Sequence, residues 1–200
     1  MSNKVRHAQL NVITGPMFCG KSTELLRRLN ISAEMGQKVL YVNHSSDNRS
    51  DTPFSTHNPS IVNIGKISGI KISNLEEITQ PENWDVIGID EAQFFTDENP
   101  DYLRNHILHW VEKKNIQVIV AGLNGDSNRN LFGQIYTLLP ICDSWDLLSS
   151  FCVSCCKNNF REDAKFSHKI SDTTSNVVEI GGKDKYVPLC RACYCKSNDL

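Results

Sequence analysis

Short apolar runs separated by polar loops dominate the pattern of this chain. The strongest runs cover residues 10–13, 39–42, 86–89 and 117–123. Apolar runs of this length, bounded by turn residues, are typical of strands buried on both faces of a parallel sheet. Residues 23–35 place leucines at helical spacing, and Gly36 marks the end of the predicted helix. A strand, a helix and a second strand in so few residues predict an α/β fold with right-handed crossovers.

The rest of the chain gives weaker signals. We expect a strand in residues 61–72, a short helix in residues 75–78 and a longer helix in residues 102–114. Residues 138–148 are expected to lead out of the core as a helix or a strand. Periodicity fades near Ser149, after which cysteines gather. This change predicts two domains, covering residues 1–149 and 150–200.

The first apolar run leads into a loop framed by glycines, with the sequence motif G-x-x-x-x-G-K-S. Between a strand and a helix, this motif is typical of a phosphate-binding loop (P-loop). Glycines let successive N–H groups point at a phosphate, and the helix N-terminus adds partial positive charge. The lysine can reach the β- and γ-phosphates, and the serine can bind Mg²⁺. A chance match in a glycine-rich turn is the disfavoured alternative. The residues expected to bind nucleotide here are Gly15, Pro16, Met17, Phe18, Cys19, Gly20, Lys21 and Ser22.

Two acids, Asp90 and Glu91, end the third strong run. A central parallel strand delivers such residues to the carboxyl edge of its sheet. Asp90 can bind Mg²⁺ directly or through water, and Glu91 can then take a proton from an attacking hydroxyl. The alternative is a pair of acids that merely caps a strand at the surface.

The cysteines form two C-x-x-C pairs, Cys152 with Cys155 and Cys190 with Cys193. Four thiolates at this spacing can close the tetrahedral shell of one Zn²⁺, which makes the site structural rather than catalytic. The intervening residues 156–189 would then form a long loop pinned at its base. A redox pair and buried free thiols are the alternatives, and Cys19 inside the phosphate loop could be a reactive thiol.

Composition narrows the function classes. The 200 residues carry a formal net charge of −2, which gives no electrostatic argument for a nucleic-acid or membrane partner. No apolar run approaches the roughly 20 residues of a membrane span. No signal-peptide pattern is present, so the expected compartment is the cytoplasm.

Four stretches together resemble the cellular-type, zinc-bearing thymidine kinases. They are GPMFCGKSTEL from Gly15, IDEAQFF from Ile89, GGKDKY from Gly181 and CRACY from Cys190. The resemblance covers about residues 10–194. It implies a RecA-like P-loop α/β domain and a small zinc domain whose lasso loop closes over the nucleoside. It also implies phosphoryl transfer from ATP, with Mg²⁺, to the 5′-hydroxyl of thymidine, and a homotetramer.

The resemblance assigns roles residue by residue. Glu91 is the general base, Asp90 is the acid on the magnesium side, and Arg49 and Lys21 steady phosphate charge. Positions on the nucleotide side are Asp47, Arg49, Asp90, Glu91, Ala92 and Gln93. Positions on the nucleoside side are Met17, Phe94, Leu123, Ser127, Phe132, Ser167, Val177, Val178, Glu179, Ile180, Gly181 and Tyr186.

The chain departs from the family pattern in three places. Ser127 stands where an aromatic ring usually stacks on the base, and such stacking is worth roughly 1–3 kcal/mol. Asn124 replaces an acid, and Glu179 replaces an apolar residue in the lasso. Two alternatives therefore stay open: a kinase with broader choice among pyrimidine nucleosides, and a nucleotide-dependent ATPase that uses its zinc module to bind nucleic acid.

Overall fold

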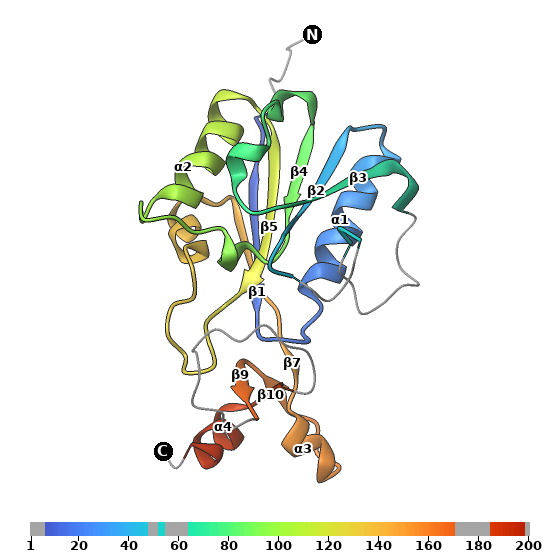
Figure 1. Cartoon of the computed structure of the whole chain (residues 1–200). Helices are drawn as coiled ribbons and strands as arrows, with labels where there is room; N and C mark the ends of the chain where they lie inside the picture. The colour runs from blue at the N-terminus through green and yellow to red at the C-terminus, as the bar shows by residue number, and fades with distance from the viewer. Residues whose placement is uncertain (1–6, 48–51, 55–63, 171–184, 199–200) are drawn as a thin grey trace.

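A computed structural model describes residues 7–47, 52–54, 64–170 and 185–198 of the chain. Within these residues, six strands form one sheet in the order β3-β2-β4-β5-β1-β6 (Figure 1), and every neighbouring pair is parallel. The strands are β1 (Leu10–Gly15), β2 (Val39–His44), β3 (Ile67–Ile72), β4 (Val86–Ile89), β5 (Gln117–Leu123) and β6 (Ser144–Leu147). This sheet confirms the predicted P-loop α/β fold. Because β1, β5 and β4 run parallel, the phosphate loop after β1 and the acid pair after β4 lie at the same edge of the sheet, as expected for a RecA-like fold.

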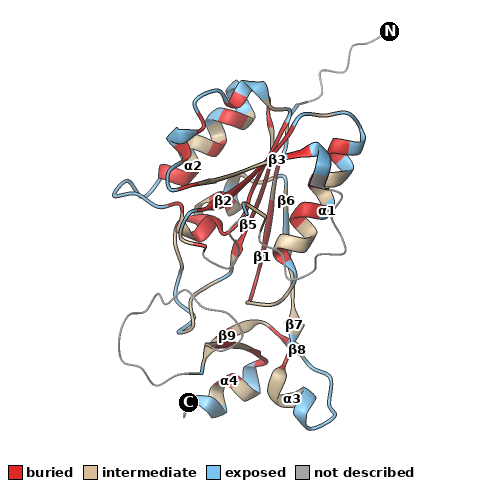
Figure 2. Ribbon diagram, turned by 45° about the vertical axis from the view of Figure 1, so that its right-hand side comes forward, coloured by how far each residue is buried: buried red, intermediate tan, exposed pale blue. Residues whose placement is uncertain are grey.

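Helices cover both faces of the sheet. Helix α1 (Lys21–Glu34) packs on one face, where Leu25 and Leu29 are fully buried. Helix α2 (Tyr102–Leu108) continues into a wider π turn (His109–Lys113) and packs on the other face. Figure 2 shows that the buried residues concentrate in the strands and in the helix surfaces that face them. The remaining helical turns are 3₁₀: Ile64–Lys66, Leu75–Glu77, Pro81–Asn83, Ala92–Phe94 and Ile135–Ile141.

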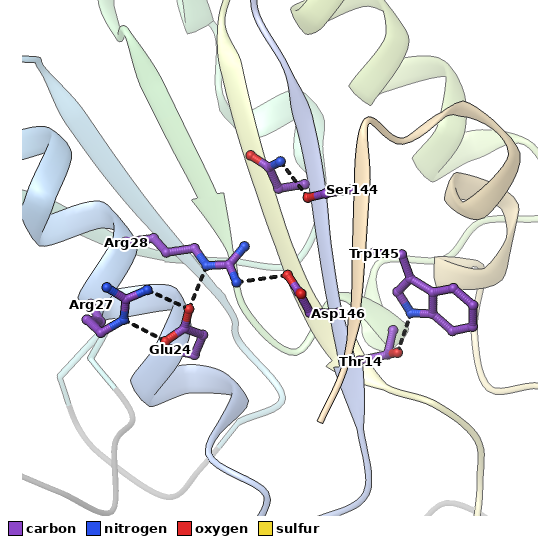
Figure 3. Close-up of polar contacts among 8 residues, drawn as sticks. Thr14, Glu24, Arg27, Arg28, Ser144, Trp145 and Asp146 are labelled. Carbon is purple, nitrogen blue, oxygen red and sulfur yellow. Dashed lines mark hydrogen bonds and ion pairs between the residues drawn. The ribbon is translucent and has the colours of Figure 1, made fainter. Parts of the chain in front are cut away.

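The predicted exit from the core in residues 138–148 is different in the structure. A 3₁₀ helix (Ile135–Ile141) returns the chain to the sheet, and β6 pairs with β1 as an edge strand. Asp146 on β6 binds Arg28 of α1 with an N–O distance of 2.8 Å, and Glu24 bridges Arg27 and Arg28 (Figure 3). On the opposite face of β6, the Trp145 indole N–H donates to Thr14. These contacts tie the edge strand to α1 and β1.

The two C-x-x-C pairs lie in a small unit at the carboxyl edge of the sheet (Figure 1). We call residues 150–170 and 185–198 the cysteine unit. Its elements are β7 (Ser150–Phe151), α3 (Val153–Lys157), β8 (Asp163–Ala164), β9 (Phe166–Lys169), β10 (Tyr186–Leu189) and α4 (Arg191–Ser197). Strands β7 and β8 pair antiparallel, and so do β9 and β10. The predicted domain boundary near Ser149 stays a prediction.

None of the helices in the described ranges has the length and apolar character that crossing a membrane requires.

Candidate functional site

The phosphate loop runs from the end of β1 into the first turn of α1. Gly20 adopts a left-handed backbone with φ of 86°, which costs glycine little. A Cβ on Gly15 would lie 2.6 Å from Cys19 Sγ and 2.9 Å from the Leu148 carbonyl oxygen, so only glycine fits there. The Lys21 ammonium donates to the Pro16 carbonyl at 2.8 Å, which places its charge across the loop. This geometry agrees with a loop built to surround an anion.

The same loop contacts the cysteine unit. The Met17 N–H donates to Ser167 Oγ at 2.9 Å, and the Ser150 hydroxyl donates to the Phe18 carbonyl at 3.3 Å. Met17 and Ser167 were both predicted on the nucleoside side, and the structure brings them into contact. The cysteine unit therefore contacts the phosphate loop at the Met17 N–H and the Phe18 carbonyl.

The acid pair follows β4 at the same edge of the sheet, with β5 between it and the phosphate loop. Asp90 is fully buried, and its two carboxylate oxygens accept from the Tyr41 hydroxyl at 2.7 Å and from the Glu91 N–H at 2.9 Å. Glu91 has a left-handed backbone with φ of 50°. A residue other than glycine in this region is uncommon, and such strain concentrates at functional sites.

Gln93 connects the second acid to β5. Its amide N–H donates to Glu91 Oε2 at 2.6 Å, and its carbonyl oxygen accepts from the Leu123 N–H at 3.0 Å. Gly133 lies so close to the backbone carbonyl of Gln93 that a Cβ on Gly133 would clash with it. Because Gln93 is 1% exposed and bonded at both ends, it fixes the direction of the Glu91 carboxylate.

Aromatic rings follow the acids. Phe95 is fully buried in the core, whereas Phe94 is half-buried and meets Phe132 edge to face at 5.7 Å. His44, at the end of β2, lies 5.6 Å from the Phe94 ring. Burial lowers the pKa of His44, and its Nδ1 accepts from the Ser46 N–H, so Nε2–H donates to the Ser73 carbonyl. A neutral imidazole and two phenyl rings therefore make an apolar wall along the segment that follows Glu91.

The four predicted cysteine ligands lie together. The Sγ atoms of Cys152, Cys155, Cys190 and Cys193 are all within 4.8 Å of one another, and all are free of disulfides. Cys155 Sγ lies 3.6 Å from Cys193 Sγ and 3.8 Å from Cys190 Sγ. Zinc–sulfur bonds of about 2.3 Å in a tetrahedron put the sulfurs about 3.8 Å apart. The arrangement therefore fits a four-thiolate metal site.

The thiols also perturb one another. Desolvation and then hydrogen bonds from the neighbouring thiols raise the pKa of Cys155. Burial acts to raise the pKa of Cys152, but backbone N–H groups of Cys190 and Cys155 lower it to about 7. Four clustered thiols cannot all ionise without a compensating cation, and a divalent metal supplies one.

Some of the other predicted residues lie in the described ranges, and some lie outside them. Asp47 is buried and accepts from the Asn43 amide at 3.0 Å, and Tyr186 is buried in β10. The predicted residues outside the described ranges are Arg49, Val177, Val178, Glu179, Ile180 and Gly181. Ser127 lies half-buried in the loop after β5, where its carbonyl accepts from the Tyr194 hydroxyl at 2.6 Å.

Sequence reasoning missed the contacts that cross the sheet. Tyr41 was read only as part of an apolar run, yet it binds Asp90 from the adjacent strand. The available signal was a tyrosine within a buried strand, since a buried hydroxyl needs a partner. His44 and Tyr194 carried no comparable signal in the sequence.

Comparisons with known proteins give the family of the chain. A family model described as "Thymidine kinase" matches residues 8–194. The thymidine kinase of Amsacta moorei entomopoxvirus is 39% identical over 190 residues, covering 94% of this chain and 98% of that protein. The thymidine kinase of Fowlpox virus is 37% identical, covering 92% and 96%. The cytosolic thymidine kinase of Cricetulus griseus is 35% identical, covering 96% of this chain and 75% of that protein.

Among solved structures, the genome packaging NTPase B204 of Sulfolobus turreted icosahedral virus 2 is a distant likeness. It has a TM-score of 0.41 and 14% identity, and the match covers 66% of this chain and 71% of that one. The sequence matches carry the assignment: the chain belongs to the thymidine kinase family.

Proposed function

We propose that the protein transfers the γ-phosphoryl group of ATP to the 5′-hydroxyl of thymidine, with Glu91 as general base. The observation that carries this assignment of roles is the Glu91 carboxylate, which Gln93 holds in a strained backbone at the sheet edge that also bears the phosphate loop. Family membership supports the class of reaction, and the geometry supports the division of labour among residues.

The donor side is built on β1 and β4. The phosphate loop and Lys21 hold the triphosphate, while Ser22 and Asp90 hold Mg²⁺. Asp90 would hold the metal from a fixed position, because Tyr41 and the Glu91 N–H bind its two oxygens and hold the carboxylate in one orientation. When bound, Mg²⁺ neutralises charge on the β- and γ-oxygens. Arg49 adds a further positive charge in this proposal.

On the acceptor side, Glu91 accepts the proton of the 5′-hydroxyl. The new oxygen–phosphorus bond forms as the bond between the γ-phosphorus and the bridging oxygen breaks, and ADP leaves. The apolar wall of Phe94, Phe132 and His44 keeps water from competing as acceptor. Positioning and charge neutralisation, rather than covalent help, supply most of the rate.

The base preference is a separate proposal. Ser127 offers no ring on which a pyrimidine could stack, so the aromatic residues among the predicted nucleoside positions are Phe94, Phe132 and Tyr186. We propose thymidine as the substrate, with deoxyuridine and other pyrimidine nucleosides as the second candidates. The experiment is a phosphorylation assay with ATP and Mg²⁺ across the natural nucleosides.

The proposal extends to the metal, the oligomeric state and the compartment. The four cysteines bind one structural Zn²⁺, and the protein acts as a homotetramer in the cytoplasm without nucleic acid or membrane partners. The edge strand β6, with Trp145 and Leu147 half-exposed, offers a surface for a second copy. The similarity to the cytosolic thymidine kinases of Cricetulus griseus and Bos taurus supports the compartment. An ATPase rate that required DNA or RNA instead of a free nucleoside would overturn this function.

Glu91→Gln tests the proposed mechanism. We expect a folded protein that binds ATP with unchanged affinity and loses on the order of 100-fold or more in kcat, as for other general bases. Glu98→Gln is the matched control, because Glu98 is an exposed carboxylate in the same connection and should leave kcat unchanged. Near-native turnover of Glu91→Gln would remove Glu91 from the role of base.

A further inference from the structure

The loop of residues 124–133 connects two functional parts of the molecule. At its two ends it contacts the segment that carries the proposed base: the Leu123 N–H binds Gln93, and Phe132 packs on Phe94. In its middle it contacts the cysteine unit instead. The loop therefore spans from Glu91 to the proposed metal site, and its shape depends on both.

Two hydrogen bonds join this loop to the cysteine unit. The Tyr194 hydroxyl donates to the Ser127 carbonyl at 2.6 Å, and the Asn124 amide donates to the Lys165 carbonyl at 3.1 Å. Tyr194 directly follows the predicted metal ligand Cys193 and is 3% exposed. A displacement of the cysteine pairs would therefore move the hydroxyl that holds Ser127.

A cation reinforces the contact. The Arg129 guanidinium lies 4.7 Å from the centre of the Tyr194 ring and 6.0 Å from that of Phe166. Arg129 has a left-handed backbone with φ of 66°, a conformation that disfavours residues with a side chain. The stacking of its guanidinium on two rings offsets that cost.

The loop itself is pre-ordered for this contact. The Asp126 carboxylate accepts from the backbone N–H groups of Asn128 and Asn130 at 2.9 and 2.7 Å. The Asp126 N–H in turn donates to the Asn130 carbonyl. A tight turn of this kind presents the Ser127 carbonyl and the Arg129 side chain on one side, where Tyr194 lies.

We propose that Arg129 and Tyr194 form a latch that positions the loop of residues 124–133 and so sets how tightly the nucleoside base is bound. The inference rests on the proposed function, because this loop follows Leu123 and carries Ser127 and Phe132, all three predicted on the nucleoside side. The inference goes further than that function because it assigns positioning roles to Arg129 and Tyr194, which are not among the predicted substrate-binding residues. Ser127 contributes no ring for stacking. The loop therefore strengthens nucleoside binding by holding its other residues, such as Phe132, in place.

Three substitutions test the latch. Tyr194→Phe removes only the hydroxyl, Arg129→Gln removes the cation, and Arg129→Lys restores a cation over the ring. Arg161→Gln is the matched control, because Arg161 stacks at 4.1 Å on Phe151 of the same cysteine unit but away from the loop. The measurements are the KM for thymidine, the KM for ATP, kcat and the zinc content per chain.

We expect Tyr194→Phe and Arg129→Gln to raise the thymidine KM by about threefold to tenfold, the range typical of one lost hydrogen bond or cation–π contact. The ATP KM and the zinc content should stay within about twofold, Arg129→Lys should recover most of the loss, and Arg161→Gln should change neither KM. An unchanged thymidine KM in both variants, or an equal rise in the ATP KM, would overturn the latch.

A second readout separates the latch from the proposed function. Trypsin can cleave after Arg129 in the exposed loop, and we expect Tyr194→Phe to be cleaved there at least severalfold faster than the unaltered protein. Equal cleavage rates would overturn the latch even in an active kinase. Failure of the unaltered protein to phosphorylate any nucleoside would overturn the proposed function, while the cleavage rates would still decide whether Tyr194 holds the loop.

Discussion

The six-stranded sheet and the cysteine unit are held together by different forces. The sheet has two large clusters of buried apolar side chains, one against α1 and one against α2. The cysteine unit buries only a small cluster in its described residues, and two of its five buried members are the cysteines Cys152 and Cys190. Figure 2 shows the contrast directly, with few buried residues in the cysteine unit. Hydrophobic burial can stabilise the sheet alone, whereas units as small as this are commonly stabilised by a structural metal.

This difference separates the two halves of the proposed reaction. The donor side stands on buried strand ends, where Asp90 is fully buried and bonded on both oxygens. The acceptor side depends on a loop whose middle is held by the cysteine unit. Damage to the sheet should therefore lower stability, and damage to the cysteine unit should selectively weaken nucleoside binding.

The largest expected effect comes from removing a metal ligand. Cys190→Ser should disorder the cysteine unit, because structural zinc contributes on the order of 10 kcal/mol to the folding of such sites. We expect the thymidine KM to rise on the order of tenfold or more, with a much smaller rise in the ATP KM. Steady-state kinetics with each substrate varied, together with zinc analysis, measure this.

Cys156→Ser is its control. Cys156 is an exposed neighbour of Cys155 that does not belong to the four-thiol cluster, so its loss should change neither KM nor zinc content. The comparison between the two regions would fail if Cys190→Ser raised both KM values equally.

The next effect is confined to the sheet. Leu29 is fully buried in α1 and packs against Gly88 of β4, so Leu29→Ala should cost about 3 kcal/mol of unfolding free energy, within the usual range for buried leucines. Urea unfolding measures the loss, and Ile31→Ala on the exposed side of α1 is the control. At a temperature where the variant stays folded, both KM values should match those of the unaltered protein. A selective rise in the thymidine KM would contradict the division.

The smallest effect concerns the edge of the sheet and depends on pH. Hydrogen bonds from Arg27, and then from Arg28, lower the pKa of Glu24 from 4.5 to about 2 against the opposing effect of desolvation. A lowered pKa in the folded state stabilises the protein above pH 4.5, and this contribution is lost as the pH falls toward 2. Glu24→Gln should therefore cost about 0.5–1 kcal/mol near neutral pH and progressively less below pH 4.5.

Urea unfolding at pH 7 and pH 3 tests this prediction. Glu34→Gln is the control, because Glu34 in the same helix makes a surface ion pair with Lys66 and is half-exposed. A Glu24→Gln difference of equal size at both pH values would show that the ion pairs of Glu24 with Arg27 and Arg28 do not stabilise the folded protein.

The sheet could largely be predicted because its central strands are buried on both faces. β1, β2, β4 and β5 read as apolar runs, and β5 was predicted with its observed bounds. β6 was not recognised as part of the sheet, because alternate residues such as Trp145 and Leu147 are exposed at the edge. The strands of the cysteine unit are two to four residues long, which is too short for a period to emerge.

The candidate site was predictable where spacing carries chemistry. The two C-x-x-C pairs gave the thiol cluster, and the glycine-framed loop gave the turn around Lys21. The contacts of Tyr41 with Asp90 and of Tyr194 with Ser127 join residues far apart in the sequence. Only the strand order and the position of the cysteine unit bring these partners together, so no local pattern could reveal them.

The most direct test of the account is the kinetics of the unaltered protein while zinc is removed with a chelator and then returned. The account predicts that loss of the metal raises the thymidine KM much more than the ATP KM, and that added zinc restores it. An absence of zinc in the purified protein, or equal changes in both KM values, would contradict the claim that the cysteine unit acts mainly on the nucleoside side.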